Sequence, residues 1–383
     1  MIMMLSATLK VENYFITLKL FNLFLELKLS ELIVGSFGME RNLLFVLLVV
    51  FTFPLVKGQP SFTERRVRDK TLNEGIAYVQ QGEYGLAAVR FDRCLELDST
   101  FAPAWLLKGR LFIEAGDLFE ARNMIETAIR YDPDLGEAYF YKGYMAYGTD
   151  TTGEDRRLFD LAISKGYRTE WSYYFRAITE IRDGMDVSAM EDLNRAIELK
   201  DDFALAYHER AGIKRRLGDY QGAHFDYQQA ITFDPDFALA YNNRGSVKML
   251  MGDYAGAIED YTRALELDPG LVIALNNRGY ARYFTEDKEG ALLDLNAAIT
   301  GGSSLASARL NKASLLAQQG QLVPALELLD ETLQDHPGDA QLYLNRGLIR
   351  ELTGDLDGAC EDWSMAKELG AEQAEEFLKE CER

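Results

Sequence analysis

Small and large apolar residues recur along the chain with a period of 34 residues. Counted in steps of 34 from Arg68, nine blocks follow one another without an insertion and end at Gln373. Position 8 of every block is glycine or alanine, and position 24 is always large and apolar or aromatic. Apolar or small residues at positions 20, 24 and 27 follow the spacing of one helix face, and a second helical pattern runs from position 3 to 14. The pattern therefore predicts two helices in each block.

Glycine and proline mark the expected ends of these helices. Position 15 is glycine in seven blocks, and position 32 is proline in four of them: Pro133, Pro235, Pro269 and Pro337. Small residues at positions 8 and 20 would let the two helices pack closely as an antiparallel pair. One pair cannot bury its apolar face alone, so we expect the pairs to stack into a solenoid. The third block lacks the small residue at position 20, so its second helix should be short and the stack locally bent.

The block Ala240–Pro269 reads AYNNRGSVKMLMGDYAGAIEDYTRALELDP. Its small, aromatic, alanine and proline positions strongly resemble the tetratricopeptide repeat family, and the resemblance extends over residues 68–373. It implies an all-α, right-handed superhelical solenoid of about nine helix-turn-helix repeats. Residues 374–383 would then form a C-terminal capping helix, and residues 59–67 a linker before the first repeat.

Position 7 is arginine or lysine in blocks two to nine, and the choice follows position 23. The five blocks with arginine have aspartate at position 23, whereas the three with lysine have methionine or leucine there. A guanidinium group pairs with a carboxylate through two hydrogen bonds, which lysine cannot do. We therefore expect partly exposed ion pairs inside five helix pairs, each contributing roughly 0.2–1 kcal/mol. A ligand-binding row of arginines is the alternative. The expected pairs are Arg176–Asp192, Arg210–Asp226, Arg244–Asp260, Arg278–Asp294 and Arg346–Asp362.

Position 6 is asparagine in four successive blocks, although asparagine is a mediocre former of helix interiors. The family resemblance implies that the first helices line a concave groove, where a ladder of amides would grip a peptide backbone. Solvated asparagines copied by duplication are the alternative, and the aromatic residues of blocks three and four, such as Tyr144 and Trp171, are the competing surface. The candidate groove residues are Asn243, Asn277, Asn311, Asn345, Asn242, Asn276, Tyr280, Tyr283 and Leu344.

Composition narrows the classes of function. Hydrophobic residues make up 48% of the chain and charged residues 27%, which is typical of a folded protein. The net charge of −20 provides no broad basic surface for nucleic acid. The three histidines leave little material for a metal site, and we find no phosphate-binding loop or nucleophile motif. The sequence therefore predicts a chain without catalytic activity, metal or cofactor.

Two of the three cysteines are candidates for a disulfide. Cys360 and Cys381 lie at similar distances from the turn expected near Gly370, so antiparallel helices would bring them to the same height. The alternative is two separate buried thiols. An oxidising compartment would permit the bond.

Residues 39–58 have the composition of a secretory signal. Arg41 precedes an apolar run of about 14 residues, shorter than the roughly 20 that a membrane-spanning helix requires. We expect cleavage near Gly58 and export to the periplasm or beyond, with an N-terminal membrane anchor as the alternative. Met39 would then be the true start, and residues 1–38 a non-native upstream extension.

Together these patterns favour a non-catalytic scaffold that binds an extended peptide or protein partner in its groove. We expect no nucleic acid partner and no stable membrane insertion after signal cleavage. An accessory subunit that supports an enzyme, or a secretion or assembly complex in the cell envelope, is the alternative. The partner and the oligomeric state stay open.

Overall fold

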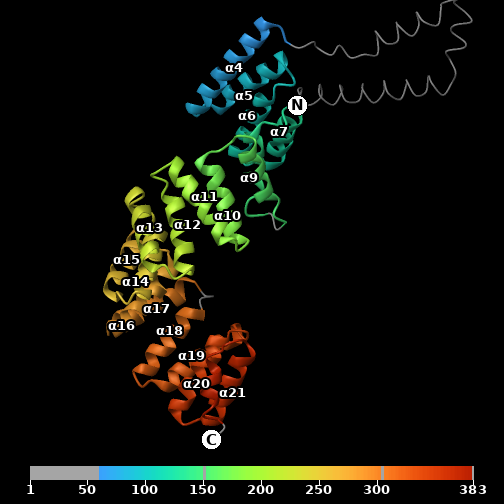
Figure 1. The fold of residues 1–383 in the computed structure, drawn as a ribbon. Helices are drawn as coiled ribbons and strands as arrows, with labels where there is room; N and C mark the ends of the chain where they lie inside the picture. Colours follow the sequence, from blue (N-terminus) through green and yellow to red (C-terminus); the bar gives the residue numbers. More distant parts are fainter. Residues whose placement is uncertain (1–59, 150–151, 303–305, 382–383) are drawn as a thin grey trace, which may run out of the picture. The chain divides into compact units, whose positions relative to one another are not determined.

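The computed structural model describes residues 60–149, 152–302 and 306–381. The expected signal segment, 39–58, and the segment before it lie outside the described residues. Within them, all regular secondary structure is helical, in nineteen helices labelled α4 to α22 (Figure 1). None of these helices has both the length and the apolar character needed to cross a membrane.

The helices alternate between first and second members of each block. The first helices are α4 (Phe62–Gln80), α6 (Ala102–Glu114), α8 (Gly136–Ala146), α10 (Glu170–Arg182), α12 (Ala204–Arg216), α14 (Ala238–Leu250), α16 (Val272–Phe284), α18 (Ala306–Gln318) and α20 (Ala340–Thr353). The second helices are α5 (Tyr84–Leu97), α7 (Leu118–Tyr131), α9 (Glu154–Ser164), α11 (Asp186–Leu199), α13 (Tyr220–Phe233), α15 (Tyr254–Leu267), α17 (Lys288–Gly301), α19 (Leu322–Asp335) and α21 (Leu356–Glu368). The short α22 (Ala374–Leu378) follows α21.

The 34-residue period sets where the helices begin. The first helices of blocks two to nine begin at block position 1 every time, from Ala102 to Ala340. The second helices of eight blocks begin at position 17, and in five of these the aspartate at position 16 caps the helix by accepting a hydrogen bond from the backbone three residues later. The seven glycines at position 15 have φ values of 75° to 85°, a conformation that ends a helix and favours glycine.

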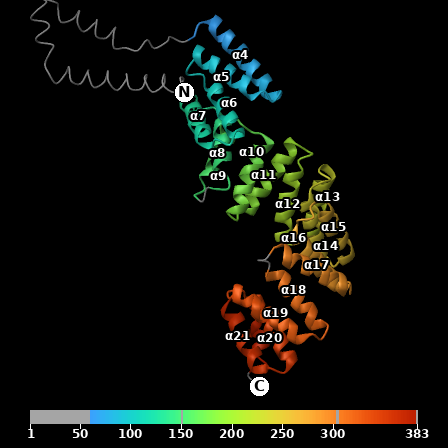
Figure 2. The same ribbon diagram turned by 180° about the vertical axis from the view of Figure 1, so that it is seen from behind.

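The chain divides into two compact units, residues 1–99 and 100–383. In the described part of the first unit, α4 packs against α5. In the second unit, each second helix contacts the first helix of its own block, and those from α7 to α19 also contact the first helix of the next block. Helices α12, α14, α16 and α18 contact one another in sequence (Figure 2). These four helices form what we call the first-helix face of blocks five to eight.

The core of each helix pair joins the small residue at position 8 to the large residue at position 24. Gly347 shows why position 8 must be small: a Cβ atom there would lie 2.5 Å from Nε1 of the buried Trp363. The same close approach joins Gly245 to Tyr261. Position 24 therefore supplies much of the apolar area that each pair buries.

Three segments refine the expectations from the sequence. The second helix of block three, α9, has 11 residues where most second helices have 14, as the pattern predicts. Helix α4 begins at Phe62, so most of the segment expected as a linker is helical; its capping box joins Ser61 and Glu64. The helix in the expected C-terminal cap is limited to the five residues of α22.

Candidate functional site

The structure places each of the five arginines at position 7 against its aspartate at position 23. In every pair, Nε and Nη2 of the arginine donate to the two carboxylate oxygens, at 2.5–2.9 Å. All five aspartates are buried. The sequence suggested partly exposed pairs, and this is wrong for the carboxylates, because the close packing of the two helices closes over position 23.

The remaining end of each guanidinium group is also occupied. Its Nη1 donates to a polar side chain on the second helix of the preceding block. Four of the five also lie over the ring of a tyrosine at position 4, with 5.2–5.8 Å between Cζ and the ring centroid. For Arg176, the hydrogen bond to Asp192 and the nearby charges raise the pKa of the guanidinium despite burial. The arginine row is thus engaged in joining helices, which disfavours the ligand-binding alternative.

A second cation that the sequence reasoning missed completes four of these pairs. Position 11 carries lysine or arginine in blocks five, six, seven and nine, one helical turn after the arginine. Its nitrogen lies 2.7–3.2 Å from the same aspartate. The four contacts are Lys214–Asp226, Lys248–Asp260, Arg282–Asp294 and Arg350–Asp362. A signal for this existed, because position 11 is apolar in all three blocks that have lysine at position 7.

Block four breaks this rule. Its position 11 is Glu180, which is 5% exposed and lies on the same side of α10 as Arg176. Glu180 Oε1 accepts a hydrogen bond from Ser188 Oγ at 2.8 Å, while its Oε2 is buried without a hydrogen-bond partner. Burial, with a contribution from the charge of Asp192, raises the pKa of this carboxyl. Block four therefore buries an acid where its neighbours place a cation.

The asparagines at positions 5 and 6 form a continuous chain of side-chain hydrogen bonds, which we call the amide relay. Asn311 donates to Asn276 at 2.9 Å, and Asn277 donates to Asn242 at 3.1 Å, each reaching back to the preceding block. Bonds within each pair of neighbours connect these steps, and Asn243 Nδ2 lies 2.9 Å from Nε2 of His208. The relay thus links four successive first helices, α12 to α18.

Not every predicted groove residue lies on an accessible surface. Asn242 and Asn276 are buried and support the relay from behind, whereas Asn243, Asn277 and Asn311 are partly exposed. Asn345 stands outside the relay and donates to the backbone oxygen of Gln341 in its own helix. Leu344 is buried in the apolar cluster around Trp363, so its expected place in the groove is wrong.

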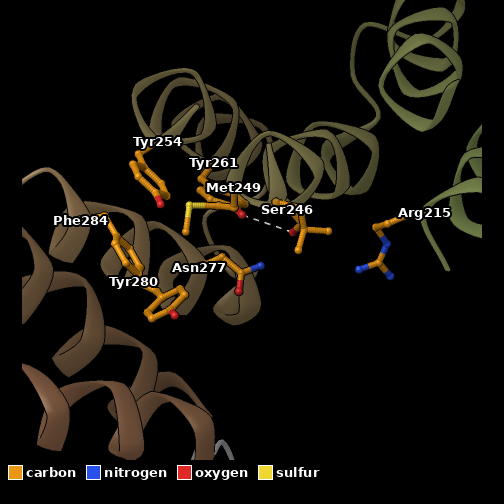
Figure 3. Close-up of a pocket in the computed structure, with 9 residues that line it drawn as sticks. Arg215, Ser246, Met249, Tyr254, Tyr261, Asn277, Tyr280 and Phe284 are labelled. Carbon is orange, nitrogen blue, oxygen red and sulfur yellow. Dashed lines mark hydrogen bonds between the residues drawn. The ribbon is translucent and has the colours of Figure 1, made fainter. Parts of the chain in front are cut away.

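A cavity of about 340 Å³ opens beside the amide relay (Figure 3). Its apolar wall comes from Met249 and Leu250 of α14, Tyr254 of α15, and Tyr280 and Phe284 of α16. The ring of Phe284 stacks on Tyr254 at 4.8 Å between centroids and meets Tyr280 edge-on at 5.0 Å. Tyr283 packs against this cluster through Phe284, at 5.2 Å.

Polar groups occupy the rest of the cavity lining. Asn277 borders the cavity and also belongs to the amide relay. Ser246 accepts a hydrogen bond from the Tyr261 hydroxyl at 3.3 Å, and burial raises the pKa of Tyr261 to about 12. Figure 3 shows Arg215 on the opposite side of the cavity from Tyr254 and Phe284. One site thus combines an amide, aromatic rings and a cation.

The aromatic residues of blocks three and four form a second cluster, most of it structural. Phe175 lies at its centre, stacked on Phe159 and Trp171 at 5.8 Å in both cases. Tyr144 and Trp171 keep exposed edges, but the large rings behind them are core.

The cysteines and histidines take structural positions. Cys360 and Cys381 form a disulfide with 5.9 Å between their Cα atoms, which ties α21 to the segment after α22. Cys94 is buried and free. Across the described ranges, no group of three or more histidine, cysteine or acidic side chains is arranged to hold a metal ion.

Comparison with known proteins identifies the family of the repeat. Family models described as "Tetratricopeptide repeat" match residues 78–141, 238–271 and 310–367, and one described as "TPR repeat" matches residues 212–252. The chain belongs to the tetratricopeptide repeat family. A curated relative, Tetratricopeptide repeat protein 16 of Homo sapiens, is 31% identical over 71 residues, which are 18% of this chain and only 8% of that protein.

Solved structures agree on the fold. Cut9–Hcn1, an APC/C hetero-tetramer, aligns over 85% of this chain and 78% of that chain, with 12% identity and a TM-score of 0.55. The pilF protein of Pseudomonas aeruginosa aligns over 55% of this chain and 96% of that chain, with 16% identity and a TM-score of 0.51. At these identities the likeness concerns the tetratricopeptide solenoid alone.

Proposed function

We propose that this chain is a non-catalytic scaffold that binds an extended segment of a partner protein along the first-helix face of blocks five to eight. Tetratricopeptide repeat proteins commonly mediate protein–protein interactions. The observation that carries the proposal is the place of Asn277, which belongs both to the amide relay and to the wall of the aromatic cavity. Backbone-binding groups and a side-chain pocket are thus adjacent.

The amide relay suits the binding of a peptide backbone. Each asparagine amide has two N–H donors and an oxygen that accepts two hydrogen bonds, and the relay uses only part of this capacity. Because the amides already hold one another in place, little side-chain entropy is lost when they bind a peptide unit. A net gain of about 0.5–1.5 kcal/mol per hydrogen bond implies modest affinity and broad sequence tolerance.

A binding experiment can test this with the full chain. Short peptides selected from a random displayed library would be measured by fluorescence polarisation against the wild type and the variant Asn277→Ala/Asn311→Ala. Loss of two backbone contacts should weaken binding by about tenfold or more. N-methylation of single peptide bonds should weaken it as well, because it removes the backbone donor.

Asn345→Ala provides the matched control. It removes an asparagine from the same block position, but one that bonds within its own helix, outside the relay and the cavity. It should bind peptides as the wild type does. Circular dichroism would establish that all variants keep their helices. Equal binding by the Asn277→Ala/Asn311→Ala variant, together with loss of binding in Trp171→Ala, would transfer the site to the aromatic cluster and refute the proposal.

The proposal also concerns the cellular location of the chain. The composition of residues 39–58 supports export to the periplasm or beyond, with an N-terminal anchor as the alternative. An oxidising compartment would also suit the bond between Cys360 and Cys381.

A further inference from the structure

Arg215 differs from the basic residues beside it on α12. Lys214 pairs with Asp226 at 2.7 Å, and Arg216 pairs with Asp186 at 2.5 Å. Arg215 has no carboxylate within 4.0 Å in the described part of the chain, although the Tyr227 hydroxyl is within its hydrogen-bonding reach. It is exposed and borders the cavity. A cation without an acidic partner therefore faces a pocket, in a chain whose net charge is −20.

The aromatic wall opposite Arg215 is particular to one repeat. Block seven is the one among the nine with aromatic residues at both position 9 and position 13, Tyr280 and Phe284. Tyr280 and Phe284 are 42% and 41% exposed, so both rings are accessible to a ligand. The preceding block has the small Ser246 at position 9, which leaves the space that the rings enclose. The cavity is thus a local feature superimposed on the repeat.

We propose that this cavity selects peptides in which a bulky apolar side chain is followed or preceded at short distance by an internal aspartate or glutamate. The apolar side chain, such as leucine, methionine or phenylalanine, enters between Met249, Tyr280 and Phe284. The acidic side chain pairs with Arg215. This inference rests on the proposed function, since it names the class of peptide that the first-helix face takes.

The geometry separates the acid from the apolar side chain along the peptide. Arg215 lies on α12 and the aromatic rings lie on α16, with α14 between them. Adjacent packed helices are about 8–10 Å apart, and the long arginine side chain spans part of the distance. At about 3.3 Å per extended residue, the acid would lie about two to four residues from the apolar side chain. The side chain of a C-terminal residue lies beside its own carboxylate and cannot bridge the two walls, so a terminal carboxylate would need its apolar partner about two to four residues earlier.

The size and lining of the cavity also fit this occupant. A volume of about 340 Å³ leaves room for a bulky apolar side chain. Such a side chain would displace water from the aromatic rings. The acidic residue of the peptide would give Arg215 the charge-assisted hydrogen bond that Lys214 and Arg216 already have.

The test uses the full chain and a positional-scanning library of peptides with acetylated and amidated ends, which carry no terminal charges. Wild-type protein should enrich peptides with a bulky apolar residue and an acid at the stated spacing. Arg215→Glu should reverse the preference at the second position, from aspartate or glutamate to lysine or arginine, and leave the apolar preference unchanged. Arg216→Glu, which changes the adjacent cation outside the cavity, should leave both preferences as they are. Tyr280→Ala/Phe284→Ala should weaken binding by about tenfold and abolish the apolar preference.

Each contrary outcome has a distinct meaning. Peptides that bind and depend on Asn277, but show no acidic preference and no response to Arg215→Glu, would overturn this inference and leave the proposed function standing. Binding that requires a free C-terminus would replace the internal acid by a terminal one and also overturn it. Self-association of the wild type that Tyr280→Ala abolishes and peptides do not compete with would make a second copy the occupant. No peptide binding at all would overturn the proposed function itself.

Discussion

The charges around Asp260 allow a quantitative test of what holds each helix pair together. Asp260 is 4% exposed and accepts hydrogen bonds from Nε and Nη2 of Arg244 at 2.8 and 2.5 Å. Lys248 Nζ lies 3.0 Å from Oδ2 of the same carboxylate, the oxygen that also accepts from Nε of Arg244. The change Asp260→Leu removes the shared anion and leaves two cations in a site where their side chains are only 11% and 15% exposed.

The burial of this cluster sets the expected magnitude. Removal of one partner from a buried ion pair costs about 3–5 kcal/mol, because the other charge stays desolvated. Arg244 keeps its hydrogen bond to Gln228 and both cations retain some solvent, so we expect about 3 kcal/mol. An exposed pair on the same helix gives the control: Glu266→Leu breaks the contact with Arg263, and should cost far less, because solvent screens both charges.

Block eight shows how the chain fills the same site without a carboxylate. Its positions 7, 11 and 23 are Lys312, Leu316 and Leu328. The triple change Arg244→Lys, Lys248→Leu and Asp260→Leu copies this arrangement into block six. It should recover at least half of the loss, since the lone lysine can extend its ammonium to water and the two leucines pack together.

The assay must be local, because the repeats of a solenoid can open separately. Amide hydrogen exchange of peptides from α14 and α15 reports the free energy of opening of block six. The reasoning is refuted if Asp260→Leu lowers this free energy no more than Glu266→Leu does. It also fails if the triple variant is as weakly protected as the single one.

Four further outcomes are expected, three from the structure and one from the composition of residues 39–58. Glu180→Lys should raise the free energy of opening of α10 and α11 by about 1 kcal/mol in hydrogen exchange, because it supplies the missing second cation. Glu180→Gln should also stabilise block four at neutral pH but not at acidic pH. Because the pKa of Glu180 is raised in the folded state, its carboxyl group contributes stability below the unfolded pKa, and this stability is lost as pH rises through the folded pKa. Cys360→Ser/Cys381→Ser should lower the protection of α21 by about 3 kcal/mol, and mass spectrometry of unreduced wild-type protein should find no free thiol at either residue. N-terminal sequencing of the natural protein should give Gln59 or a residue close by, whereas a cytoplasmic product that starts at Met1 would exclude export.

The helices could be predicted from sequence because their signals are local. Glycine at position 15 and aspartate at position 16 act within one turn of the chain, so the period alone places the start of most helices after α4 to within about two residues. The early start of α4 was missed although Ser61 and Glu64 form a recognisable capping box. Because the repeats were counted from Arg68, residues 59–67 were assigned to a linker and this capping box was overlooked.

The site was predictable only where it depends on pairs within one block. The match between arginine at position 7 and aspartate at position 23 identifies partners, and the same comparison at position 11 would have found the second cation. The amide relay is different, because Asn277 reaches Asn242 across 35 residues through the stacking of neighbouring blocks. The cavity forms where small side chains leave space between helices, and the repeat pattern does not predict where this happens.

The bonds of Asn277 and Arg278 explain why two polar side chains recur side by side in these helices. Consecutive residues point about 100° apart around a helix, so they face different neighbours. Arg278 turns toward the second helix of its own block and Asp294, while Asn277 turns toward the first helix of the block before. Duplication of this pair therefore copies both a bond within the repeat and a bond between repeats. Variation at positions 9, 12 and 13 can then shape a cavity such as the one beside Tyr280 without disturbing the bonds that hold the stack together.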